Sequence, residues 1–227
     1  MGLTLGRRFG IIRRHDLSKT ALTCWYLSGL LVALAFSFGF YFLKPALYGR
    51  VAPHDILDAF TWMDGRWYKQ IAVEGYHFDP NGRSNIAFFP TFPLLARAVM
   101  VATGVRVEAA LLVVAHLSFL AALTALAAYV RSRRQPDAPR TADWVVLSAA
   151  LFPTGCFFRL AYSESTCLFL LVLLAMYAIE RYWPLWLIAV IIGFATATRA
   201  VGVALLLPFA IHIFRRTAAL GQKDGRS

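Results

Sequence analysis

Apolar runs separated by short polar segments dominate the pattern of the chain. Residues 21–43 carry no charged side chain, and further apolar runs follow at 108–130, 143–160, 166–179 and 185–214. About 20 apolar residues are enough to cross the hydrocarbon core of a membrane as a helix. The last run is interrupted by Arg199, Gly202 and Pro208, so we expect two short spans that meet at an outer turn near Arg199, with one tilted span and an interfacial tail as the alternative. The pattern predicts an all-α polytopic membrane protein with about six transmembrane helices.

Composition and charge agree with a membrane protein. Of the 227 residues, 59% are hydrophobic, above the roughly 45–50% of soluble domains. The formal net charge is +11, and basic residues gather in 1–20, 131–140 and 215–227, as the positive-inside rule predicts for cytoplasmic segments. This distribution argues against nucleic-acid binding. Cys24, Cys156 and Cys167 form no CxxC pair, so neither a disulfide framework nor a metal site is expected.

The layout is therefore a single membrane domain over residues 1–227. We expect a cytoplasmic basic tail at 1–20, an uncleaved first transmembrane helix at 21–43, a large extracytoplasmic loop at 44–106, transmembrane helices within 107–214 and a cytoplasmic tail at 215–227. Inside the loop, the apolar stretch 86–103 is interrupted by Pro90, Pro93 and Arg97. It is too short for a span, so we expect an interfacial or re-entrant helix that starts near Pro93. The basic segment 131–140 supports this, since a span at 86–103 would place it outside.

The loop concentrates acidic and aromatic residues between 58 and 93, a combination that suits a carbohydrate site. Asp64 is the best candidate for a catalytic group because it lies between Trp62 and Trp67. In a helix, Asp64, Trp67, Tyr68 and Ile71 would share one face. Neighbouring rings would partly desolvate the carboxylate and make it a stronger base. The other acids have simpler interpretations: Asp58 as a helix cap or ion-pair partner, and Glu74 and Asp79 as solvated or turn residues.

Three separated segments fall on the same side of the membrane in this layout: the loop, the turn at 159–165, and Arg199. Arg159 and Arg199 suit an anionic phosphate held above the hydrocarbon. The alternative is that each arginine extends to lipid head groups. Glu164 is either a helix cap or a substrate contact, and His116 is expected to hydrogen-bond between helices.

Four short blocks, in order, resemble the PIG-V-like (GPI mannosyltransferase 2-like) membrane mannosyltransferases, a family of the GT-C class of glycosyltransferases. The blocks lie at 62–76 (WMDGRWYKQIAVEGY), 87–95, 152–165 and 197–202. The resemblance implies a GT-C-like fold and inverting transfer of mannose from a polyprenyl- or dolichyl-phosphate-mannose donor to a glycolipid or glycan acceptor on the non-cytoplasmic face. It implies Asp64 as general base and a donor phosphate near Arg199 or Arg159. The expected substrate contacts are Trp62, Arg66, Trp67, Tyr68, Arg159, Tyr162, Glu164 and Arg199.

No metal or other cofactor is expected, because the leaving group is already a phosphate anion that basic residues can stabilise. The expected location is the bacterial cytoplasmic membrane, or the endoplasmic reticulum membrane in a eukaryote. Two alternatives stay open. The chain ends at Ser227, where family members usually continue with more helices, which favours a non-catalytic or truncated homologue acting as a membrane subunit. A lipid-linked sugar transporter is the other, although it should carry more charged residues inside its spans.

Overall fold

The chain folds into helices throughout the part that the structure describes. The computed structural model describes residues 14–43, 52–133, 141–166 and 171–224, and these ranges contain no β-strand. Within these ranges, three helices are long and apolar enough to cross a membrane: Lys19–Phe42, Val107–Ser132 and Ala200–Ala218. The predicted all-α fold is thus confirmed, and these helices are consistent with the predicted membrane protein, whereas the number of six spans stays a prediction. The basic segment at 1–13 and Cys167 lie outside the described residues.

The first group of helices consists of α1 (Arg14–Phe42), α6 (Val107–Ser132) and α7 (Thr141–Leu151), which contact one another. Small side chains occupy much of their shared core. Ala21 and Cys24 of α1, Ala127 of α6 and Ala150 of α7 are all buried there beside Phe119. Small residues let helices approach one another closely. In a bilayer the lipid tails are as apolar as the side chains, so burial from water does not drive association, and close dispersion contacts hold the helices together instead.

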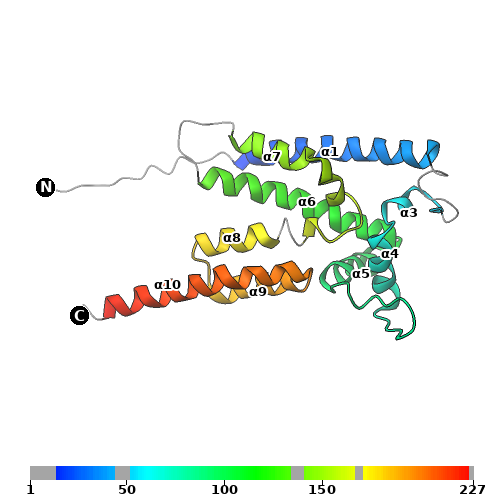
Figure 1. Cartoon of the computed structure of the whole chain (residues 1–227). Helices are drawn as coiled ribbons and strands as arrows, with labels where there is room; N and C mark the ends of the chain where they lie inside the picture. Colours follow the sequence, from blue (N-terminus) through cyan, green and yellow to red (C-terminus); the bar gives the residue numbers. More distant parts are fainter. Residues whose placement is uncertain (1–13, 44–51, 134–140, 167–170, 225–227) are drawn as a thin grey trace.

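The second group forms the C-terminal part of the bundle. It contains α8 (Val172–Glu180), α9 (Leu185–Thr196), the 3₁₀ helix η3 (Ala200–Leu205) and α10 (Leu206–Asp224). The chain reverses direction between α9 and η3, and Arg199 lies at this reversal (Figure 1). Gly202 makes the close return possible, because a Cβ there would lie 2.4 Å from the Ala195 carbonyl oxygen. The apolar run 185–214 therefore forms a hairpin around Arg199.

Three short helices gather at one end of the bundle: α3 (Ile56–Phe60), α4 (Asp64–Glu74) and α5 (Thr91–Thr103). Figure 1 shows them together, and the C-terminal end of α10 lies at the opposite end. α5 begins at Thr91, two residues before the expected Pro93, which still lies in the first turn where proline is tolerated. At 13 residues, α5 extends only about 20 Å and cannot cross the hydrocarbon core alone. Its interfacial or re-entrant placement stays a prediction.

The run at 143–160 is interrupted more strongly than expected. α7 ends at Leu151, and a separate 3₁₀ helix, η1 (Pro153–Phe158), follows. Pro153 has no N–H to continue an α-helix, and the Gly155 N–H donates to the Phe152 carbonyl instead, at 2.7 Å. The predicted kink is therefore a helix end, and η1 leads into the turn at 159–165.

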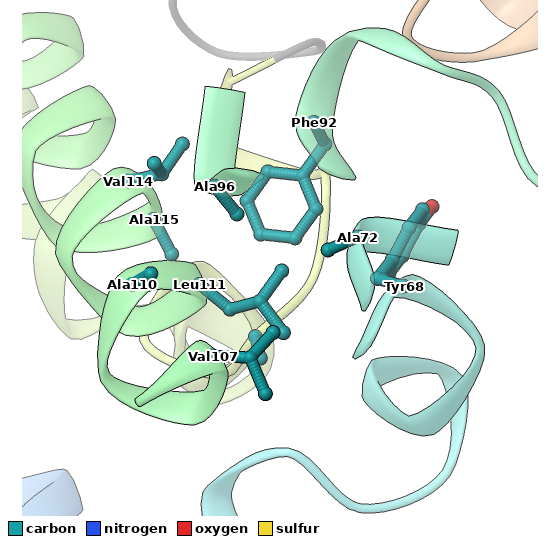
Figure 2. Close-up of a cluster of buried hydrophobic side chains, with 10 residues drawn as sticks. Tyr68, Ala72, Phe92, Ala96, Val107, Ala110, Leu111, Val114 and Ala115 are labelled. Carbon is teal, nitrogen blue, oxygen red and sulfur yellow. The ribbon is translucent and has the colours of Figure 1, made fainter. Parts of the chain in front are cut away.

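A compact apolar core fixes α4 on the bundle (Figure 2). Tyr68 and Ala72 of α4 pack with Phe92 and Ala96 of α5, and Leu111 of α6 completes the contact. All five side chains are buried. Each large side chain removed from water in this way contributes about 1.5–3 kcal/mol, so the core gives α4 a fixed orientation.

The close return at Gly202 predicts a large effect of a single methyl group. The Gly202→Ala variant should be destabilised by about 1–3 kcal/mol, because the Cβ collides with backbone atoms of α9. Gly193→Ala is the matched control, since no atom lies within 4 Å of its added Cβ. Thermal unfolding in detergent micelles, followed by circular dichroism, measures both. Equal melting temperatures for the two variants would contradict this packing.

The placement of the loop and the end of α10 at opposite ends of the bundle predicts opposite sides of the membrane. Asn81 is exposed in the loop, and Thr217 is exposed near the end of α10. In a chain with its three cysteines replaced by alanine, Asn81→Cys should react with an impermeant maleimide in intact cells. Thr217→Cys should react only after permeabilisation. The reverse result would invert the orientation, and labelling of both in intact cells would exclude opposite sides.

Candidate active site

A polar pocket lies against α3 and α4 at the loop end of the bundle. Its volume is about 780 Å³. The lining residues are His54, Asp58, Trp62, Met63, Asp64, Arg66, Trp67, Lys69, Gln70, Val73, Glu74 and Arg83. Carboxylates, basic groups and two indole rings thus share one wall. Four of the predicted site residues line this polar pocket: Trp62, Asp64, Arg66 and Trp67.

Asp64 is the first residue of α4 and is exposed to the polar pocket. The partial positive charge of a helix N-terminus stabilises a carboxylate in this position. The expected desolvation of Asp64 by its neighbours is not found, because both indole rings have other partners. The Arg66 guanidinium lies 3.2 Å from the centre of the Trp62 ring, and Trp67 stacks on Phe88 at 5.8 Å between ring centres.

Met63 sets the turn between α3 and α4. Its φ angle is 55°, a region that residues other than glycine seldom adopt. Its side chain is 69% exposed, so burial does not hold this conformation in place. Strained residues of this kind concentrate at binding and catalytic sites, where surrounding structure enforces them. Here the turn places Trp62 and Asp64 on either side of Met63, both at the polar pocket.

Tyr68 corrects one expectation from the sequence. It was expected to contact substrate, but it lies in the core with 5% of its surface exposed. Its hydroxyl is 2.8 Å from the Ser163 hydroxyl, and burial raises the pKa of Tyr68, so the phenol stays neutral. The rings of Phe88 and Phe92 pack edge-on against Tyr68, while Phe88 also stacks on Trp67 and Asp64 stays exposed. Tyr68 therefore attaches α4 to the turn at 159–165.

Tyr162 lies behind Asp64 and not in the polar pocket. Its side chain is buried and stacks on Phe157 with ring centres 5.7 Å apart. Burial raises the pKa of Tyr162 to about 12, and the negative charge of Asp64 adds to the rise. The phenol consequently stays protonated at neutral pH, where it interacts with the backbone of Asp64. Tyr162 supports the residue expected to act as base.

A second cavity, which we call the apolar groove, adjoins the polar pocket. Its volume is about 390 Å³. It is lined by Ala35, Phe36, Gly39, Ala59, Phe60, Trp62, Met63, Leu160 and Tyr162. Trp62 and Met63 belong to both cavities, so the polar pocket and the apolar groove meet at these two side chains.

Ion pairs of Lys69 and Arg106, two residues that the sequence did not single out, support the wall of the polar pocket. Lys69 Nζ lies 2.5 Å from Glu108 Oε1 of α6 and 3.6 Å from Asp58 Oδ1 of α3. Arg106 Nη1 lies 2.7 Å from Asp55 Oδ2. The expectation that Asp58 is an ion-pair partner is confirmed, while Asp55 caps α3. Lys69 could have been found from its spacing three residues after Arg66 on α4.

The remaining acids of the loop have the simple roles expected of them. Glu74 is exposed at the end of α4, where it accepts a hydrogen bond from the Gln70 side chain. Asp79 stabilises a turn, since its carboxylate accepts the Asn81 N–H at 2.9 Å. Among the described residues, no group of three or more His, Cys, Asp or Glu side chains could hold a metal ion.

Arg159 corrects a second expectation. It was expected at the membrane surface beside a donor phosphate, but only 1% of it is exposed. Its guanidinium donates to the Trp25 carbonyl and, at 2.6 Å, to the Ser28 hydroxyl of α1, and it lies against the Trp25 and Phe119 rings. The short helix η1 directs this side chain into the bundle. His116 donates from Nε2 to the Arg159 carbonyl at 3.0 Å, which confirms its expected role between helices.

Arg199 and Glu164 form an ion pair with 2.5 Å between Nη1 and Oε1. Both side chains are partly exposed, but neither lines the polar pocket. The hairpin that carries Arg199 is attached to α5, because the Thr91 N–H donates to the Ala197 carbonyl at 3.0 Å. The loop, the turn at 159–165 and Arg199 therefore lie next to one another, as the sequence predicts. Arg199 forms an ion pair with Glu164 there and does not line the polar pocket.

The two arginines Arg159 and Arg66 are predicted to respond differently to replacement. Arg159→Ala should lower the free energy of unfolding by about 2–5 kcal/mol, because it leaves a cavity and breaks the link to α1. Arg66→Ala should cost less than about 1 kcal/mol, since the side chain is exposed and loses only its contact with Trp62. Thermal unfolding in one detergent compares them. A larger loss for Arg66→Ala would contradict these assignments.

The comparisons with known proteins leave the site to be interpreted from its own chemistry. No family model, no curated protein and no solved structure matches this chain. The interpretation therefore rests on the geometry of the polar pocket, the apolar groove and the groups around Asp64.

Proposed function

We propose that the protein is a membrane glycosyltransferase that moves mannose from a polyprenyl- or dolichyl-phosphate-mannose donor to a glycolipid or other acceptor. Transfer takes place on the non-cytoplasmic face and inverts the anomeric centre. One observation carries the proposal: an exposed carboxylate, Asp64, lies in a polar pocket with two tryptophans and several basic groups, and this pocket meets an apolar groove. Such a site suits a substrate with a sugar at one end and a hydrocarbon at the other.

The chemistry assigns Asp64 as general base. Its carboxylate accepts the proton of the acceptor hydroxyl while the hydroxyl oxygen attacks the anomeric carbon of mannose. The bond from that carbon to the donor phosphate breaks, and the polyprenyl phosphate leaves with both bonding electrons. Because the leaving group is already an anion, it needs stabilising positive charge and no proton. Trp62 and Trp67 provide aromatic surface for the sugar ring.

The positive charge closest to Asp64 along the chain comes from Arg66, in the same turn of α4. Arg66 is exposed and lines the polar pocket, unlike Arg159, which lies inside the bundle, and Arg199, which pairs with Glu164. We therefore assign the donor phosphate to Arg66 in place of the two arginines expected from the sequence. Arg199 and Glu164 are assigned a positioning role. Their ion pair holds the hairpin next to the turn at 159–165, and neither side chain contacts the substrate.

The proposal predicts that transfer depends on the Asp64 carboxylate. In proteoliposomes supplied with polyprenyl-phosphate-mannose and candidate glycolipid acceptors, Asp64→Asn should lower the transfer rate by about 10²–10⁴-fold, the usual contribution of a general base. The variant should unfold within a few degrees of the original chain, because Asp64 is exposed and loses only its interaction with the N-terminus of α4, about 0.3–1 kcal/mol. Loss of mannosylated product, measured by mass spectrometry, is the readout.

Glu74→Gln is the matched control for this experiment. Glu74 is also an exposed carboxylate on α4 and lines the same polar pocket, but it lies at the opposite end of the helix. Its variant should retain the transfer rate within about threefold, because only Asp64 is assigned as the base. Equal product from the original chain and Asp64→Asn would refute the general base. Absence of product with every donor and acceptor pair would favour a non-catalytic membrane subunit.

A further inference from the structure

The segment that joins α4 to α5, residues 75–90, is held in shape by its own hydrogen bonds, and we call it the joining loop. Asn85 is buried in it, with 1% of its surface exposed. The Asn85 side chain accepts the His77 N–H at 2.8 Å, and the Asn85 N–H donates to the His77 carbonyl at 3.3 Å. The Ser84 hydroxyl accepts the Asp79 N–H at 2.9 Å and donates to the Asp79 carbonyl at 3.1 Å. The joining loop is therefore a compact unit packed by its own side chains.

The joining loop turns apolar side chains outward. Phe78 is 65% exposed, Ile86 is 57% exposed and Tyr76 is 49% exposed. His77 and Asn85 bond to each other, so the residues next to them in the chain lie close together. We call the side chains of Tyr76, Phe78 and Ile86 the loop patch. Single exposed apolar residues are ordinary on a protein surface, but a cluster held in a fixed shape indicates a partner.

The position of the joining loop indicates that this partner is the lipid bilayer. The joining loop lies at the end of the bundle where α1 ends (Figure 1). α5 follows directly and exposes Leu94, Leu95 and Val101. α6 begins shortly after α5, at Val107, where the apolar segment Val107–Ser132 also begins. The loop patch thus lies near the level at which lipid head groups meet hydrocarbon.

The hydrogen bonding of the joining loop also favours lipid over a protein partner. Hydrocarbon offers no hydrogen-bond partners, so a segment that enters a bilayer must pair its own polar groups. The joining loop does this with Asn85 and Ser84, and the Asp79 carboxylate accepts the Asn81 N–H at 2.9 Å. A protein partner would supply hydrogen bonds of its own, and such internal pairing would not be needed. Aromatic rings beside an aliphatic side chain are typical of segments that lie in the membrane interface.

We propose that the joining loop is a membrane anchor, with the loop patch inserted among the bilayer lipids at the boundary between head groups and acyl chains. The anchor contacts the bilayer surface and selects no single lipid. It adjoins the candidate site, because Arg83 of the joining loop lines the polar pocket and Asn85 donates to Gln70, another lining residue, at 3.4 Å. The anchor thereby fixes the polar pocket at one height above the hydrocarbon. None of these steps depends on the proposed transfer reaction.

Fluorescence quenching locates the loop patch. In the full chain with its three cysteines replaced by alanine, Ile86→Cys carries an environment-sensitive dye in phosphatidylcholine nanodiscs, where both faces of the bilayer meet solvent. A nitroxide on the lipid acyl chains should quench this dye. Aqueous iodide should quench it at least about threefold less than the same dye at Asn81→Cys. Asn81 is the matched control, since it is exposed in the joining loop but lies outside the loop patch.

Two results would overturn the anchor. Equal quenching by iodide at positions 86 and 81 would show that the loop patch lies in water. Protection of the Ile86→Cys dye from iodide without quenching by the lipid nitroxide would show that protein covers the loop patch, for example a second copy of the chain.

A second arm tests whether the apolar side chains drive insertion. Phe78→Asp removes a ring and adds a charge, which is costly in a bilayer, so it should make the Ile86→Cys dye at least about twofold more accessible to iodide. Asn81→Asp adds the same charge outside the loop patch and should change this quenching by less than about 1.5-fold. Both positions are exposed, so both variants should keep the melting temperature of the parent chain. Unchanged quenching in a folded Phe78→Asp chain would refute the role of the loop patch.

The outcomes are independent of the proposed function. Neither arm uses a donor or an acceptor, so the Asp64→Asn background should leave the quenching unchanged. If transfer is absent in every assay while the Ile86→Cys dye lies in lipid, the enzyme proposal fails and the anchor stands. If transfer depends on Asp64 while the dye lies in water, the enzyme proposal stands and the anchor is refuted.

Discussion

A cationic side chain inside an apolar helix bundle must find oxygen atoms or aromatic faces, since water is excluded. Arg159 meets this requirement with the Trp25 carbonyl, the Ser28 hydroxyl and two aromatic rings. The space is tight, because a Cβ on Gly29 would lie 3.3 Å from the Arg159 guanidinium. Among the described residues, no carboxylate pairs with Arg159 in this bundle. Its position is therefore set by oxygen atoms of α1 and by the rings of Trp25 and Phe119.

The rest of the site follows from this anchor through two attachments. The turn directly after Arg159 binds α3, because the Ala161 N–H donates to the Phe60 carbonyl at 3.1 Å. The same turn binds α4 through Ser163 and Tyr68. Gly65 lets α4 approach this turn, since an added Cβ would come 3.3 Å from the Ala161 carbonyl oxygen. The location of Asp64 thus depends on contacts that are made on the hidden side of α4.

Hydrophobic periodicity was sufficient to predict the helical bundle and the hairpin around Arg199, because both follow from run length and from charged interruptions. Spacing also placed Asp64 and Trp67 on a helix at a polar site. It did not distinguish Tyr68 from them, since the difference comes from Phe92 and from Ser163, which contact Tyr68 only in the folded chain. The sequence pattern also could not predict that Arg159 points into the bundle, because this direction depends on where α7 ends and η1 begins.

The length of α1 has a consequence for the environment in which the site works. The apolar segment of α1, Lys19–Phe42, has 24 residues and extends about 36 Å, longer than the roughly 30 Å of hydrocarbon in a typical bilayer. A helix longer than the hydrocarbon tilts until its apolar length fits. Because the apolar groove is built on the last turns of α1, such a tilt changes the height of the groove above the lipid tails. The thickness of the bilayer therefore affects how easily a lipid reaches the site, even when no residue of the site is changed.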